Sequence, residues 1–85
     1  MEKEKFYEII KSSENSSAFD MFQIKWDRGN GIIERRVIFE GFDSIDKPLL
    51  HLEDSRDYLD INRIGGYDSI KSLTRIHSDN SLSEY

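Results

Sequence analysis

The sequence contains no recognisable pairing of a nucleophile with a base. The chain has no cysteine, and its two histidines are His51 and His77. Catalysis by a serine hydroxyl needs a histidine or another base beside it. The serines follow no G-x-S-x-G pattern, the strained turn that exposes such a nucleophile. We therefore predict that the protein is not an enzyme.

One stretch begins like a calcium-binding loop. Asp60, Asn62 and Gly65 occupy its first, third and sixth positions. The pattern then fails, because Ile64 stands where an oxygen ligand is needed and Lys71 where a bidentate glutamate is needed. Neither histidine has a partner at zinc-site spacing, and the glycines spell no phosphate-binding motif. The sequence predicts no metal site and no cofactor.

The charges are concentrated in the middle of the chain. Seven acids and two bases lie between residues 40 and 60, so this segment carries the net charge of −5 of the whole chain. Such a segment suits docking on a basic surface, although a charge of this size also serves plain solubility. The residues that we predict to contact a partner are Asp43, Asp46, Glu53, Asp54, Asp57, Asp60 and Tyr58.

These observations favour binding over catalysis. We predict a protein that occludes a basic protein partner stoichiometrically, as an inhibitor, an immunity factor or an anti-defence factor. Its carboxylates could imitate nucleic-acid phosphates. Direct nucleic-acid binding is not expected, because Arg35 and Arg36 are the only adjacent basic residues.

Self-association is the alternative, with the chain acting as a structural or adaptor subunit. An 85-residue chain buries a small core, which makes a homodimer a plausible source of extra stability. In that case we expect Trp26 or Phe42 to be buried between copies. The aromatic residues that exceed the needs of a small core are Tyr7, Trp26, Phe42, Tyr58 and Tyr67.

Composition also bears on location. A chain without cysteine is typical of a reducing compartment. The first residues contain no apolar stretch of the kind that a signal peptide needs, and no window approaches the roughly 18 apolar residues of a membrane span. We expect a cytoplasmic protein without membrane association.

The elements that must position these residues follow from apolar spacing. Phe6, Ile9 and Ile10 recur at helical spacing, which predicts a helix over residues 5–11, ended by the polar loop at residues 12–17. Apolar residues occupy every second position over 22–27, which predicts a strand with one buried face.

The glycine-rich turn that follows, at residues 28–31, predicts a hairpin spanning residues 19–42. A short third strand is expected at 49–52.

The C-terminal half shows a different spacing. Residues 53–64 fit a helix, with strand alternation of Leu59 and Ile61 as an open alternative. Ile70, Leu73 and Ile76 form a stripe that predicts a helix beginning after Asp68.

The sequence thus predicts an α+β domain over residues 1–77. It should contain an N-terminal helix, an antiparallel sheet of about three strands centred on the hairpin, and one or two C-terminal helices. Residues 78–85 are expected to form a flexible tail.

Overall fold

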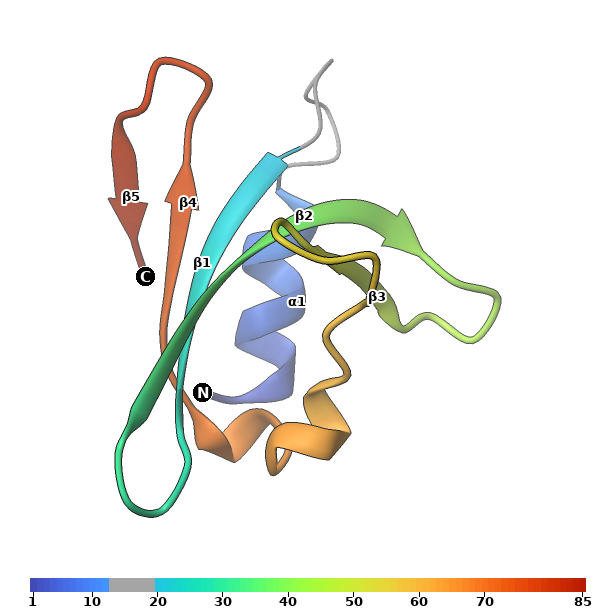
Figure 1. Cartoon of the computed structure of the whole chain (residues 1–85). Helices are drawn as coiled ribbons and strands as arrows, with labels where there is room; N and C mark the ends of the chain where they lie inside the picture. Colours follow the sequence, from blue (N-terminus) through green and yellow to red (C-terminus); the bar gives the residue numbers. More distant parts are fainter. Residues whose placement is uncertain (13–19) are drawn as a thin grey trace.

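The computed structural model describes residues 1–12 and 20–85, and it shows one N-terminal helix beside a five-stranded antiparallel sheet (Figure 1). The strands lie in the order β3-β2-β1-β4-β5. The elements are α1 (Lys3–Lys11), β1 (Asp20–Asp27), β2 (Ile32–Phe42), β3 (Pro48–Leu52), two short 3₁₀ turns η1 (Ile61–Ile64) and η2 (Tyr67–Ser69), β4 (Ile70–Ile76) and β5 (Leu82–Glu84). The predicted α+β class is confirmed, whereas the details of the C-terminal half are wrong.

The predicted hairpin forms from β1 and β2. Its turn is closed by the amide of Arg28, which donates to the Gly31 carbonyl at 2.9 Å. The Asp27 carboxylate accepts the amide of Gly29 at 2.8 Å, and Gly29 has a φ of +93°, which glycine adopts at little cost. The third strand is also present, as β3. The polar run at residues 12–17 lies almost wholly outside the described residues.

The helix that we expected after Asp68 is instead the strand β4. Its register against β1 shifts between Lys25 and Trp26, so β4 has one extra residue there. This irregularity places both Ile70 and Leu73 in the buried core, although they stand three positions apart. The β-bulge thus produces a helix-like interval between them, whereas Ile76, the third residue of the stripe, lies on the opposite face of the strand.

The helix predicted at residues 53–64 is also absent. The chain turns back after β3, because the amide of Leu52 donates to the Asp57 carbonyl and the amide of Leu59 donates to the Leu50 carbonyl. His51 and Tyr58 form a single antiparallel bridge, and Leu59 is buried. The strand alternative for this segment was therefore nearer to the structure, and only its last residues form a 3₁₀ turn.

The expected flexible tail, residues 78–85, contains the edge strand β5. A turn precedes it, in which the amide of His77 donates to the Ser81 carbonyl at 2.8 Å and Asn80 has a φ of +68°. The Asp79 carboxylate accepts the amide of Ser81. Residues 82–84 thus pair with β4 as a strand of the sheet, although their polar composition predicted a flexible tail.

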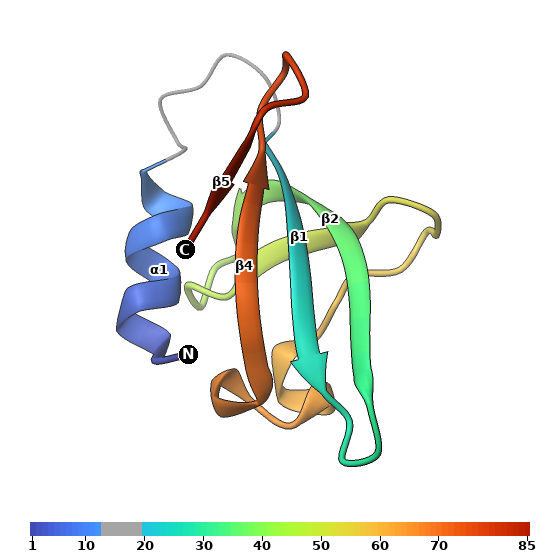
Figure 2. The same ribbon diagram turned by 90° about the vertical axis from the view of Figure 1, so that its left-hand side faces the viewer.

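The core lies between α1 and one face of the sheet, and the view in Figure 2 shows the helix on that side of the strands. Phe6 and Ile10 of α1 are fully buried, and so are Phe22 and Ile24 of β1. Trp26 belongs to the same core with 7% of its surface exposed. The chain thus buries Trp26 within its own core, which leaves Phe42, of the two side chains expected between copies, with partly exposed surface.

Removing the aromatic ring of Phe6 should detach the helix from the sheet. The Phe6→Ala change should cost about 3–5 kcal/mol, comparable with the roughly 3–5 kcal/mol that a core of this size supplies. We expect the variant to be largely unfolded in urea titrations followed by Trp26 fluorescence. The control Ile45→Ala, at a side chain 70% exposed, should stay within about 0.5 kcal/mol of the parent chain. An unchanged midpoint for Phe6→Ala would contradict the packing described here.

Candidate functional site

Five of the seven acids of the central segment lie in two loops, one on each side of β3. The first is the turn between β2 and β3, in which Asp43 accepts the backbone amides of Ile45 and Lys47, both at 2.9 Å. The next acid, Asp46, has a φ of +60°, and its carbonyl accepts the Tyr7 hydroxyl at 2.8 Å. Asp43 therefore holds the turn in shape, and its carboxylate is engaged in local hydrogen bonds.

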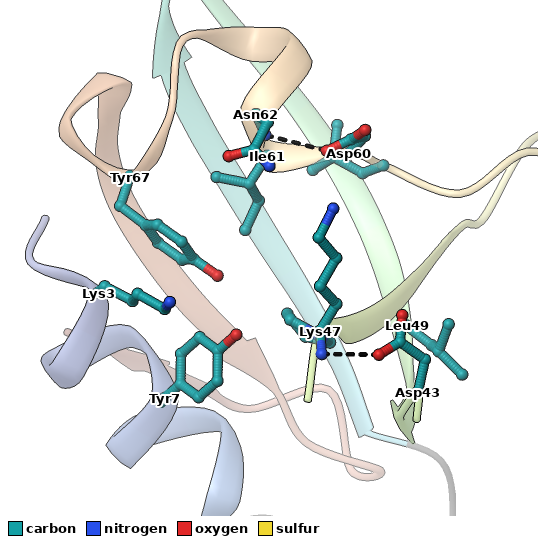
Figure 3. Close-up of a pocket in the computed structure, with 11 residues that line it drawn as sticks. Lys3, Tyr7, Asp43, Lys47, Leu49, Asp60, Ile61, Asn62 and Tyr67 are labelled. Carbon is teal, nitrogen blue, oxygen red and sulfur yellow. Dashed lines mark hydrogen bonds between the residues drawn. The ribbon is translucent and has the colours of Figure 1, made fainter. Parts of the chain in front are cut away.

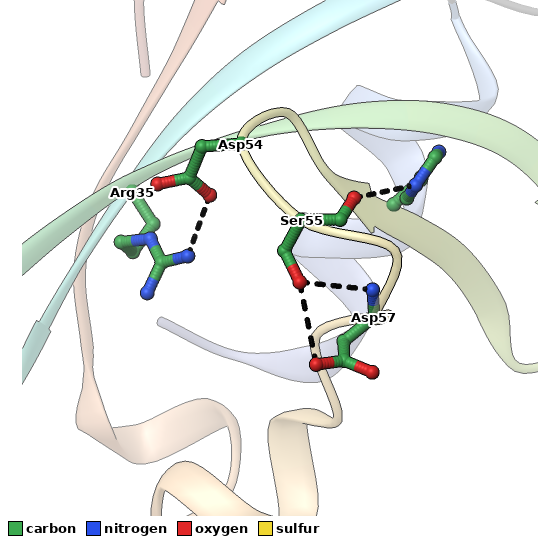
Figure 4. Close-up of polar contacts among 5 residues, drawn as sticks. Arg35, Asp54, Ser55 and Asp57 are labelled. Carbon is green, nitrogen blue, oxygen red and sulfur yellow. Dashed lines mark hydrogen bonds and ion pairs between the residues drawn. The ribbon is translucent and has the colours of Figure 1, made fainter.

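The second loop, residues 53–57, is named the acidic loop here. It is fixed to the sheet by its own backbone, since the amide of Glu53 donates to the Arg36 carbonyl at 3.1 Å. Asp54 Oδ1 lies 2.7 Å from Arg35 Nη2, and Asp57 accepts a hydrogen bond from the Ser55 hydroxyl (Figure 4). The side chains of its three acids are exposed. The predicted row of acids along a helix does not form, but the acids do face solvent together.

Tyr58 follows the acidic loop directly and is held in one orientation. Its hydroxyl donates to Glu40 Oε1 at 2.6 Å, and its ring stacks on His51 with the centroids 5.1 Å apart. The hydrogen bond to Glu40, with smaller contributions from burial and from the charge of Glu40, raises the pKa of Tyr58. The ring remains 51% exposed. Tyr58 thus presents a fixed aromatic surface beside the acids.

Glu40 and His51 are residues of this site that sequence reasoning missed. The His51 ring is placed by Glu40 Oε2 at 3.3 Å from Nδ1 and by the Ser55 carbonyl at 2.9 Å from Nε2. The contacts of Glu40 cross between strands and span 11 and 18 residues. The sequence could have predicted these contacts only if residues 53–57 had been interpreted as the loop of a hairpin.

Asp60, the last of the predicted acids, caps the turn η1. Its carboxylate accepts the amide of Asn62 at 3.0 Å, and Gly65 ends the turn with a φ of +109°. The stretch that resembles a calcium loop is therefore a capped 3₁₀ turn. Asp60 lies apart from the acidic loop and faces a cavity.

That cavity has a volume of about 220 Å³ and opens between α1, the β2–β3 turn and η1 (Figure 3). Its polar lining is electrically balanced, with Lys3 and Lys47 against Asp43 and Asp60; the other lining residues are Tyr7, Pro48, Leu49, Leu59, Ile61, Asn62 and Tyr67. It is smaller than the roughly 300–1,000 Å³ of typical ligand pockets.

Two tyrosines of the cavity pack against each other, with the ring centroids of Tyr7 and Tyr67 6.0 Å apart. Burial, and after it the neighbouring Tyr7 hydroxyl, raises the pKa of Tyr67. Phe42 packs on Tyr7 with the centroids 5.6 Å apart. These aromatic residues, which exceed the expected needs of a small core, are thus engaged in packing among α1, β2 and η2.

A serine and a histidine do meet elsewhere in the molecule. His77 lies 2.7 Å from the Ser83 hydroxyl through its Nε2 atom. The nearby Asp79 carboxylate, however, accepts hydrogen bonds from the amide and hydroxyl of Ser81. Those hydrogen bonds lower the pKa of Asp79 and hold it in the turn before β5. The pair therefore ties β5 to β4, and a triad geometry is not in place in the described part of the chain.

Within residues 1–12 and 20–85, no three histidine, aspartate or glutamate side chains lie close enough together to hold a metal ion. Over the same residues, no helix combines the length and the apolar character needed to cross a membrane. The sequence matches no protein-family model, no curated protein and no solved structure.

The half-buried Tyr67 side chain should make the fold sensitive to alkali. Because the pKa of Tyr67 is higher in the folded chain than the ordinary value near 10, the unfolded chain loses its proton first as the pH rises. The free energy of unfolding should therefore be constant up to about pH 10 and fall above it. Urea titrations between pH 8 and 11.5 would measure this loss.

The Tyr67→Phe variant should show a smaller loss above pH 10 than the parent chain, whereas Tyr85→Phe, at a side chain 43% exposed, should show the same loss. Equal alkaline loss in all three proteins would contradict the raised pKa of Tyr67 in the folded chain.

Proposed function

We propose that this protein acts by binding a basic protein partner stoichiometrically, through the acidic loop and Tyr58. The observation that carries the proposal is a backbone-anchored loop whose acids are exposed beside a half-exposed, oriented tyrosine. Binding of this kind needs no catalytic group. The partner would be blocked by occupation of its basic surface, as an inhibitor, an immunity factor or an anti-defence factor does.

Anchoring of the loop supports this proposal. Both ends of the acidic loop are fixed, by Glu53 on β2 and by the contact of Leu52 with Asp57. A loop that is already ordered loses less conformational entropy on binding than a free one. Tyr58 adds an aromatic side chain that is about half exposed and so can contact a partner. Tyrosine is among the residues that often dominate the binding energy of an interface.

Charge distribution supports it as well. The segment from residue 40 to residue 60 carries the net charge of the chain, and the flanking segments are neutral. Such an uneven field accelerates encounter with a basic surface and orients the two proteins. A partner that normally binds phosphates would offer the complementary charge, which is the basis for mimicry of nucleic acid.

Some carboxylates of the central segment stabilise turns, whereas others are exposed and can be replaced without disturbing a turn. Asp43 and Asp60 accept backbone amides, so their replacement would disturb the fold. Glu53 and Asp57 are exposed, and the pair Glu53→Lys/Asp57→Lys should weaken partner binding at least about tenfold, since close charge pairs across interfaces couple strongly. Capture from host lysate, followed by calorimetry with the captured partner, measures this.

The control variant is Glu4→Lys/Glu8→Lys, which reverses two exposed acids on α1 and changes the net charge equally. It should keep near-parental affinity. Salt at about 0.5 M should release the partner from the parent chain, because the Debye length is then only a few Å. Equal loss in both variants would show that net charge and not the acidic loop determines binding.

A further inference from the structure

The face of the sheet opposite α1 carries a row of apolar side chains. Residues directly opposite in an antiparallel pair point to the same face of the sheet. The register places Ile38 beside Met21, Met21 beside Ile76, and Ile76 beside Leu82. One continuous apolar row therefore crosses β2, β1, β4 and β5 on the face away from the helix, which lies on the other side of the strands (Figure 2).

This row is more apolar than a solvent-facing sheet surface requires. Antiparallel sheets with one covered face usually alternate apolar residues inside with polar residues outside. Here Leu82 is 59% exposed, and its neighbours in the row are only half-buried. None of the four belongs to the buried core.

A polar row runs beside the apolar one. It consists of Arg36, Gln23, Thr74 and Glu84, in register across the same four strands. Within the described residues, the guanidinium of Arg36 and the carboxylate of Glu84 take part in no ion pair or hydrogen bond. They stand at opposite ends of the row, three strands apart, or about 14 Å. One unpaired charge of each sign thus flanks the apolar row.

We propose that a second copy of this chain packs on this face, sheet against sheet, about a twofold axis that runs along the strands between β1 and β4. That rotation places Ile38 over Leu82 of the second copy and Met21 over Ile76 of the second copy. It also places Arg36 over Glu84 of the second copy, twice in the dimer. Stacked sheets lie about 10 Å apart with their strands nearly aligned, which suits this arrangement.

The charges select a second copy as the occupant. The same rotation brings Lys25 over the neutral Ser72 of the second copy, and Lys25 already has an ion partner in Glu34 at 3.8 Å. The pattern is thus complementary to itself, as a twofold interface requires. The inference goes beyond the proposed function, because β3 and the acidic loop extend past the second copy and stay exposed.

The test is sedimentation equilibrium of the full chain over a wide concentration range. The parent chain, of 10.0 kDa, should show a concentration-dependent mass that approaches twice this value. Leu82→Lys should raise the dimer dissociation constant at least about tenfold, since it buries a charge in the apolar row. Ile45→Lys, at an exposed apolar residue of the β2–β3 turn, should leave the constant unchanged. Circular dichroism establishes that each variant is folded.

Exchanging the charges of Arg36 and Glu84 tests whether the dimer forms through this face and not through another one. Arg36→Glu should weaken the dimer, and the double variant Arg36→Glu/Glu84→Arg should restore it, because the two residues are too far apart to pair within one chain. Restoration supports the proposal. A parent chain that remains monomeric, a dimer unaffected by Leu82→Lys, or a double variant that fails to recover would each overturn it. Partner capture by the folded monomeric Leu82→Lys variant tests the acidic loop independently.

Discussion

The rest of the structure depends on the burial of one face of the central strand β1. Phe22, Ile24 and Trp26 alternate along it, and they belong to the same hydrophobic cluster as Phe6 and Ile10 of α1. Because β1 pairs with both β2 and β4, its buried face aligns the buried faces of its neighbours. The nine-residue helix covers one side of the sheet, and no α-helix in the part of the chain that the structure describes covers the other side.

Polar side chains stabilise the loops through hydrogen bonds, since the chain has no cysteine that could form a disulfide. Asp43, Asp60 and Asp79 each accept a backbone amide in a turn. A net charge counted from the sequence treats all carboxylates alike. In the folded chain they differ, because a carboxylate that accepts backbone amides would lose those hydrogen bonds if it bound a partner. The exposed carboxylate of Glu53 keeps that freedom, and that of Asp57 would give up only the hydrogen bond from the Ser55 hydroxyl.

Local spacing predicted the elements whose contacts are local, and it failed where contacts cross the sheet. The N-terminal helix and the β1–β2 hairpin follow from periods of 3.6 and 2 and from a glycine turn. β4 was mistaken for a helix because its bulge separates Ile70 and Leu73 by three residues. In the candidate site, the exposure of the acids and of Tyr58 agrees with the sequence analysis. The contacts of Glu40 and His51 were not predicted, because the backbone hydrogen bonds that return the chain along β3 have no local signature.

The two edges of the sheet bear on how this protein can associate. An exposed edge strand offers unpaired backbone groups to another chain. Beyond β3 the chain turns back, and Leu52 and Leu59 donate their amides across that edge. At the other edge, β5 is only three residues long, and the amide of Tyr85 is already bonded to the Leu73 carbonyl. Little backbone is therefore available for strand addition, so both proposed contacts rely on side chains, those of the open face of the sheet and those of the acidic loop.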